Sequence, residues 1–331
     1  FLKFQKQNFR RQKMNQIERF KAMVEMRLFD EACLEGVPTM EIHGELHTGI
    51  GQEAISAGLL GHLKNSDALV STHRNHYHAL IKGVNPYRLM SEIFEKKTGI
   101  CQGFGGHMHP FSLKQNFSAT GIVGQSLPVA LGYAYAFKIR KEDSLAIGVI
   151  GDGAANHGTF HETLNIAGAW KLPLLVLIEN NGYGISVPIS KVLATDTIAE
   201  RAKSYAAWGK CVNGDDPDIV SEAVEEAINH IRSNQGPAIL EAVCNRIRGH
   251  YEGDTDHYRS KTEKQNMLKD DPINTYSEKL LSQKVLTEDE IKNIINTSKQ
   301  KMFELLKRVR GEKMPLPETA LNYIFCEKTD D

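Results

Sequence analysis

Two short apolar runs constrain the fold more than any other feature of this chain. Residues 145–150 and 174–178 are almost wholly apolar, and each run ends close to a glycine and an oxygen ligand, Asp152 in one case and Asn181 in the other. Such strands are typical of a parallel sheet that is buried on both faces. Ligands of open α/β sheets bind beyond the carboxyl ends of the strands. The sequence therefore predicts a strand, helix, strand unit that places Asp152 and Asn181 side by side.

The residues around Asp152 predict a site for a diphosphate and its metal ion. Mg²⁺ prefers six oxygens and usually takes one or two carboxylates, with phosphates and water in the other positions. Asp152 offers a charged oxygen and Asn181 a neutral one. Gly151 and Gly153 let the backbone approach a phosphate closely, and the following helix directs amide hydrogens at it. The chain has no Gly-Lys-Ser/Thr sequence, so this is not a Walker loop.

The segment from Gly151 to Asn181 resembles the thiamine diphosphate signature, in which Gly-Asp-Gly precedes Asn-Asn at about this distance. Five further motifs resemble the α subunit of the first component of 2-oxo acid and acetoin dehydrogenase complexes, and they follow one another in that family's order. They lie at residues 47–54, 71–76, 105–109, 121–128 and 246–250. The resemblance runs from about residue 15 to about residue 320. It implies an α/β, three-layer thiamine diphosphate-binding fold with a mostly parallel central sheet flanked by helices.

The resemblance also implies roles for individual residues. Magnesium would be bound by the side chains of Asp152 and Asn181 and by the carbonyl of Tyr183. The residues implied to bind the cofactor are His73, Arg74, Gly121, Val123, Asp152, Gly153, Ala154, Asn181 and His250. His250 and His47 would face the reacting carbonyl as proton donors or charge stabilisers. A zinc site at His157 and His161, which are spaced to share a helix face, is the competing interpretation of the histidines.

The same resemblance implies that the chain does not act alone. In that family the glutamate that activates the cofactor belongs to a separate β subunit, and this chain offers no evident substitute. We therefore expect two α and two β chains, with acyl transfer to a lipoyl domain of the acyltransferase component. The substrate would be acetoin or pyruvate, with a slight lean to acetoin from residues 72–74 and 248–254. The alternatives are a branched-chain 2-oxo acid dehydrogenase α subunit, a self-sufficient transketolase-like enzyme and a catalytically silent paralogue.

Composition agrees with an enzyme subunit. The chain has 331 residues, 41% of them hydrophobic, and a net charge of −1, so neither nucleic acid nor an anionic membrane is an expected partner. Five cysteines without a Cys-x-x-Cys pair indicate a reducing compartment. We expect a cytoplasmic protein, or one of the mitochondrial matrix or plastid if the basic residues 1–15 are the remnant of a transit peptide.

Residue patterns also predict the order of the elements. We expect one domain over residues 16–331, preceded by a basic arm at 1–15. Helices are expected at 15–33, 52–63, 86–95, 126–139, 159–170, 216–232, 272–281 and 287–309. Strands are expected at 68–71, 145–150, 174–179 and 238–243. The polar stretches 103–119 and 246–271 are expected to be long loops at the site.

Overall fold

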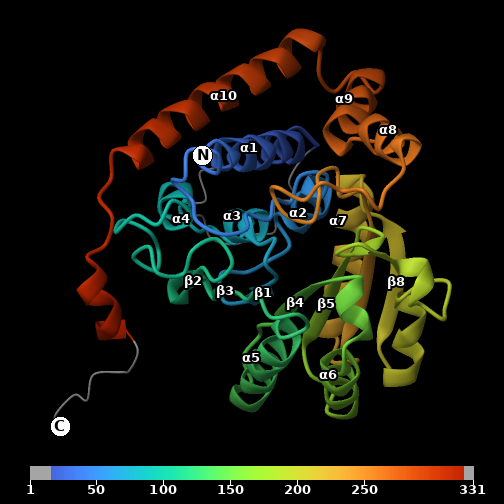
Figure 1. The fold of residues 1–331 in the computed structure, drawn as a ribbon. Coiled ribbons are helices and arrows are strands. Elements are labelled where there is room, and N and C mark those ends of the chain that lie inside the picture. Colours follow the sequence, from blue (N-terminus) through green and yellow to red (C-terminus); the bar gives the residue numbers. More distant parts are fainter. Residues whose placement is uncertain (1–15, 324–331) are drawn as a thin grey trace.

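A mostly parallel sheet of seven strands lies at the centre of the part of the chain that this computed structural model describes, residues 16–323 (Figure 1). The basic arm expected at residues 1–15 lies outside the described residues. The strand order is β2-β3-β1-β4-β5-β9-β8, and every neighbouring pair is parallel except β2 and β3. The strands are β1 (Ala68–Ser71), β2 (Phe111–Ser112), β3 (Phe117–Ala119), β4 (Ala146–Gly151), β5 (Leu174–Asn180), β8 (Trp208–Asn213) and β9 (Ala238–Val243). A separate hairpin pairs β6 (Tyr183–Gly184) with β7 (Val187–Pro188).

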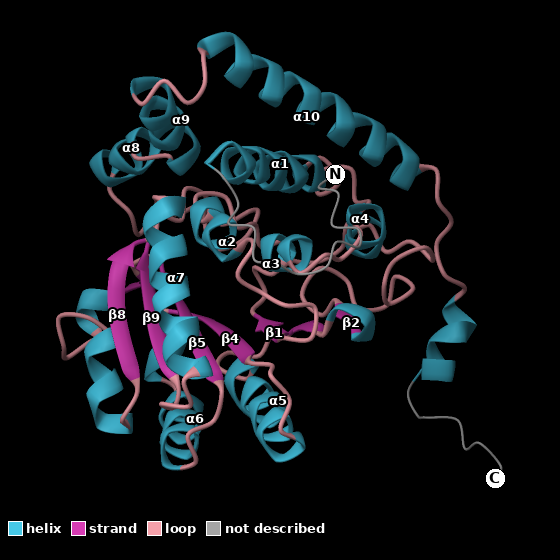
Figure 2. Ribbon diagram, turned by 180° about the vertical axis from the view of Figure 1, so that it is seen from behind, coloured by secondary structure: helices cyan, strands magenta, loops and turns pink. Residues whose placement is uncertain are grey.

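Helices cover both faces of this sheet (Figures 1 and 2). One side carries α1 (Gln16–Leu34), α2 (Glu53–Leu59), α3 (His76–Ile81), α4 (Pro86–Ile93), α7 (Pro217–Arg232), α9 (Pro272–Ser282) and α10 (Glu288–Arg310). The other side carries α5 (Ser126–Arg140) and α6 (Gly158–Ala169), while α8 (Lys261–Lys269) lies beside α9. The short 3₁₀ helices are η1 (Leu113–Gln115), η2 (Gly153–Asn156), η3 (Ile189–Lys191), η4 (Ala199–Tyr205) and η5 (Pro317–Tyr323).

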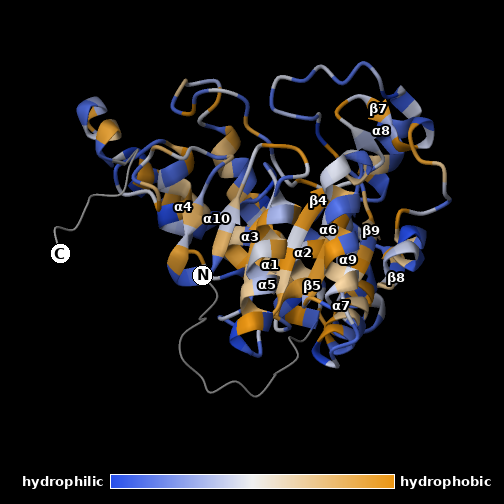
Figure 3. Cartoon of the chain, turned by 90° about the horizontal axis from the view of Figure 1, so that it is seen from below, coloured by the Kyte–Doolittle hydropathy of each residue, from blue (hydrophilic) through white to orange (hydrophobic). Residues whose placement is uncertain are grey.

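Two hydrophobic cores lie on opposite faces of the sheet because alternate residues of a strand point in opposite directions. In β4, Ile147 and Val149 belong to the core formed with α1, α2 and α7, whereas Ala146 and Ile150 belong to the core formed with α5 and α6. Hydrophobic colour accordingly concentrates in the strands and on the inner sides of the helices (Figure 3). No helix among the described residues is long and apolar enough to cross a membrane.

The expected fold class is confirmed, and the four expected strands are present within one residue of their expected ends. The edge strand β8 was not predicted because its residues are mostly half-exposed and show no apolar run. The expectation of an unbroken loop over residues 246–271 is wrong, since α8 occupies Lys261–Lys269. This helix is polar but well capped: the Ser260 hydroxyl accepts a hydrogen bond from the Glu263 amide at 3.1 Å.

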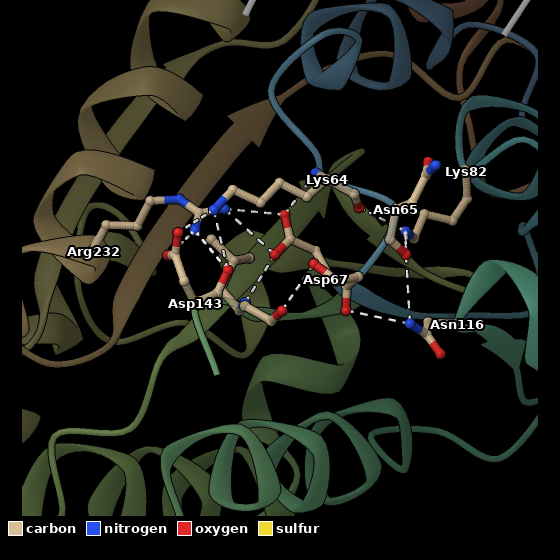
Figure 4. A network of polar contacts seen from close by, with 10 residues as sticks. Lys64, Asn65, Asp67, Lys82, Asn116, Asp143 and Arg232 are labelled. Carbon is tan, nitrogen blue, oxygen red and sulfur yellow. Dashed lines mark hydrogen bonds and ion pairs between the residues drawn. The ribbon is translucent and has the colours of Figure 1, made fainter. Parts of the chain in front are cut away.

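The amino ends of the central strands are joined by a polar network around Asp67 (Figure 4). This fully buried carboxylate precedes β1 and accepts the backbone N–H of Leu145, before β4, at 2.9 Å and that of Lys64 at 2.8 Å. Arg232, the last residue of α7, donates to Asp67 at 3.2 Å and also to the exposed Asp143 at 2.7 Å. One carboxylate thus holds two strands and a helix together at the edge opposite the expected site.

We expect Asp67→Ala to destabilise the chain by about 3–5 kcal/mol, because it leaves the Arg232 guanidinium and the Leu145 amide without their buried partner. Asp143→Ala removes the other carboxylate bound to Arg232, but its side chain is 78% exposed, so we expect a loss of about 0–1 kcal/mol. Urea unfolding followed by circular dichroism measures both changes. Equal losses in the two variants would contradict the importance assigned to Asp67.

Candidate active site

The carboxyl ends of four parallel strands meet at one cavity of about 370 Å³. Residues that follow β1, β4, β5 and β9 all line it, as the topology of an open α/β sheet requires. In the register of the sheet, Gly151 lies beside Glu179, which places the turn after β4 next to the turn after β5. The backbone therefore places Asp152 and Asn181 at the same edge of the sheet, as predicted.

Two oxygens in this cavity are buried and have no hydrogen-bond partner among residues 16–323. They are Oδ2 of Asp152 and Oδ1 of Asn181. Asn181 is oriented by Gln52, whose Oε1 accepts a hydrogen bond from the Asn181 amide nitrogen at 2.9 Å. Burial raises the pKa of Asp152 to about 6, although backbone amides and Arg246 oppose this shift. Because unpaired buried oxygens are costly, this pair is suited to a hard cation such as Mg²⁺.

The turn after Asp152 approaches the β6 backbone very closely. A Cβ atom on Gly153 would lie 2.9 Å from the Cα of Gly184, so only glycine fits without displacement. The residues after Asp152 form η2, and α6 begins only at Gly158 with His157 as its N-cap. The amides nearest to Asp152 thus come from a 3₁₀ turn, and the helix expected at 159–170 follows it as α6, with both ends within one residue of the expected ones.

Two buried arginines line the cavity, Arg74 after β1 and Arg246 after β9. Arg74 donates to the carbonyls of Thr48 and His250, and its Nη2 lies 3.2 Å from His250 Nδ1. Arg246 donates to the Ile185 carbonyl at 2.9 Å and to the Tyr258 hydroxyl at 2.7 Å.

Neither guanidinium binds a carboxylate among the described residues. Burial, and then the charge of Arg246, lower the pKa of Arg74 to about 9. Two cations held so close together in a buried wall favour an anionic ligand.

Imidazole rings gather beside Arg74. The ring centroid of His47 lies 4.6 Å from that of His73 and 5.0 Å from that of His250. Burial lowers the pKa of all three, with the charge of Arg74 as the next cause, and that of His250 falls to about 4. These rings are therefore neutral at pH 7 in the free chain.

The loop that carries Arg246 and His250 is held by its own side chains. Arg259, whose side chain is fully buried, donates to the carbonyls of Arg246 and Arg248, the latter at 2.7 Å. Asp254 accepts the backbone N–H of His250 at 2.7 Å. Bonds to the backbone on both sides of residue 248 fix the arginine and the histidine relative to each other.

Most of the predicted site residues come together. Those that line the cavity are His73, Arg74, Val123, Asp152, Gly153, Ala154, Asn181, Tyr183 and His250. His47 lies behind the wall, against His73 and His250, and Gly121 lies beside Met108 and His109. The Tyr183 carbonyl faces Arg246 at 3.5 Å. The histidines of the zinc alternative have other partners, because His157 caps α6 and His161 bonds to the Tyr205 hydroxyl at 2.6 Å.

Sequence reasoning did not assign roles to Gln52, which contacts a cavity residue, or to Glu179 and Arg246, which line the cavity. Gln52 orients Asn181, Glu179 lies in the cavity wall, and Arg246 adds the second cation. Burial raises the pKa of Glu179 to about 8 against the influence of Arg74. The position of Arg246, three residues after the expected strand 238–243, is a signal that could have revealed it, since four strands end at this edge.

Comparison with known proteins agrees with this geometry. The model of the dehydrogenase E1 component family matches residues 21–318. The α subunit of acetoin:2,6-dichlorophenolindophenol oxidoreductase of Bacillus subtilis is 39% identical over 266 residues, which cover 80% of each chain. The pyruvate dehydrogenase E1 component subunit α of Rhizobium meliloti is 36% identical over 284 residues, 85% of this chain and 82% of the relative.

The sheet, the cavity at its carboxyl edge and these matches define an oxidoreductase component with an α/β fold. The chain belongs to the dehydrogenase E1 component family, as an α subunit of the type found in acetoin and pyruvate dehydrogenases.

The arginine pair predicts affinity for diphosphate even without an organic cofactor. We expect Arg74→Gln to weaken the binding of inorganic diphosphate by about tenfold to a hundredfold, the usual value of a charged hydrogen bond. Arg248→Gln is the matched control, because Arg248 bonds to Glu252 at 2.7 Å and does not line the cavity. Isothermal titration calorimetry in Mg²⁺ buffer measures the difference. Equal affinities in both variants would refute the anion site.

Proposed function

We propose that this chain binds thiamine diphosphate and Mg²⁺ in the cavity and, with a β subunit, performs the first step of an acetoin or pyruvate dehydrogenase complex. The observation that carries the proposal is the pair of unpartnered buried oxygens on Asp152 and Asn181, which lie in one cavity with two arginines that bind no carboxylate. A magnesium diphosphate has the charges that this cavity leaves uncompensated.

The residues divide between the metal and the phosphates. Asp152 and Asn181 hold Mg²⁺ through their side chains, and Tyr183 does so through its carbonyl. Arg74 and Arg246 bind the diphosphate oxygens, together with the backbone amides of Gly153 and Ala154. Gly121 and Val123 hold the aminopyrimidine, and the Val123 side chain, which is 56% exposed, supports the cofactor from the rim of the cavity.

When bound, thiamine diphosphate would supply the nucleophilic carbon for chemistry at the substrate carbonyl. The histidines of this chain manage protons around that carbonyl. His250 lines the cavity, and His47 contacts its ring from behind. Because their pKa values are lowered in the free chain, the rings meet the substrate as neutral N–H donors. A diphosphate beside Arg74 would offset the positive charge that contributes to this shift.

A partner chain has a suitable surface around the cavity. Large apolar side chains are exposed at its rim, namely Ile122, Val123, Ile185, Val187 and Val192. An apolar rim of this kind fits a protein interface. We infer that a β subunit covers it, that two α and two β chains assemble, and that the acyl group passes to a lipoyl domain of the acyltransferase component. The name α subunit in the relatives agrees with such a partner.

The identity of the substrate is the most specific part of the proposal. Relatives named for acetoin and relatives named for pyruvate both match most of the chain. A branched-chain 2-oxo acid remains the alternative. The chain should therefore be purified alone and with a co-expressed β subunit, and acyl transfer to a lipoyl domain should be assayed from each of the three substrates. Full turnover by the chain alone would contradict the proposed division of the cofactor site.

We expect Asp152→Ala to weaken the binding of thiamine diphosphate in the presence of Mg²⁺ by about tenfold to a hundredfold or more, because it removes the only charged ligand proposed for the metal. Asp196→Ala, at an exposed position, is the matched control. Calorimetry with the assembled subunits measures both affinities. Unchanged affinity for thiamine diphosphate in the Asp152→Ala variant would contradict the proposal that Asp152 binds the metal.

A further inference from the structure

Three imidazoles converge at the wall of the cavity. His47 precedes α2, His73 follows β1 and His250 follows β9. One ring nitrogen from each residue lies within 4.8 Å of the other two, and the rings of His73 and His250 are 5.4 Å apart. Such a set from three separate segments has the form of a metal site with three protein ligands and an open position.

The distances between the ring nitrogens require an adjustment. Bonds of about 2.0–2.1 Å from a tetrahedral zinc ion hold its nitrogens roughly 3.4 Å apart, so nitrogens that lie within 4.8 Å of one another have to close by up to about 1.4 Å. All three histidines lie outside helices and strands, where side-chain torsions can change without moving an element. The exposed carboxylate of Glu45 lies 4.0 Å from His47 Nε2.

The ligand atoms are available. The lowered pKa values leave the rings without an extra proton at pH 7, which is the form that binds a metal. His73 Nε2 is buried and has no hydrogen-bond partner. His107 supports the set from behind, because its Nε2 lies 3.5 Å from His47 Nδ1 and also contacts the Glu45 carbonyl. A partner in this position orients a metal-binding imidazole.

Charge sets the choice of metal. Arg74 lies 3.2 Å from His250 Nδ1 and opposes any cation, so only an ion with high affinity for nitrogen can bind. Imidazole suits Zn²⁺, Cu²⁺ and Ni²⁺, whereas Mg²⁺ prefers oxygens.

We infer that His47, His73 and His250 form a second metal site, distinct from Asp152 and Asn181, which takes one Zn²⁺ in the absence of thiamine diphosphate. If the proposed function is correct, zinc would occupy the nitrogens that His250 and His47 offer to the substrate, and the site would be inhibitory. That consequence rests on the proposed function. The metal site itself does not.

The test is a titration of the full, tag-free chain with Co²⁺, in excess Mg²⁺ and without thiamine diphosphate, followed by Zn²⁺. We expect one Co²⁺ per chain, with the intense visible absorption of four-coordinate cobalt, and its displacement by an equal amount of Zn²⁺. His73→Phe keeps an aromatic ring and should weaken this binding at least about tenfold. His257→Phe, at an exposed position, is the control and should leave it unchanged.

His47→Phe provides a second variant in case His73→Phe does not fold, and circular dichroism checks the fold of each. Absence of a saturable cobalt site would overturn the inference, and so would equal affinity in the wild type and in either folded variant. The readout is independent of turnover, so a failure of the proposed function would leave this result interpretable.

Discussion

The parallel pairing of β4 with β1, β5 and β9 is the constraint on which the rest of the structure depends. Because these strands run in one direction, every segment that leaves a carboxyl end begins at the same edge of the sheet. Arg74, Asp152, Asn181 and Arg246 come from four separate parts of the sequence, yet all reach one cavity. Asp67 joins the opposite ends of β1 and β4 to the end of α7, so the strands that lead to Arg74 and Asp152 are held at both ends of the sheet.

The cavity contains buried ionisable side chains whose charges the described residues do not pair with one another. Neither buried arginine bonds to a carboxylate among the described residues, and burial raises the pKa of Asp152 and Glu179. Each of these groups is less stable in its charged form than it would be in water. A ligand that carries both a divalent cation and a diphosphate relieves these costs together, whereas either ion alone relieves only part. We therefore expect such a ligand to bind more tightly than either ion alone.

Sequence reasoning succeeded where a local pattern determines the structure. The apolar runs of β4 and β5 predicted both the sheet and the meeting of Asp152 with Asn181. It failed where the signal is weak or non-local. The half-exposed β8 and the polar α8 lack an apolar pattern, and the short η2 turn between Asp152 and the expected helix was not predicted. Gln52 lies far from Asn181 in the sequence, so no spacing rule could have shown that it orients this ligand.

The hydrogen bonds from Arg259 to the carbonyls of Arg246 and Arg248 connect the arginine proposed to bind the anion with the histidine proposed to donate a proton. His250 cannot withdraw far while Arg246 stays in place, because the short backbone between them is held on both sides. Residues 246–259 would consequently behave as one cassette during evolution or engineering. If the segment around His250 is exchanged between related chains, Arg259 and Asp254 should be transferred with it. A graft limited to residues 248–251 would lose the hydrogen bonds that position the histidine.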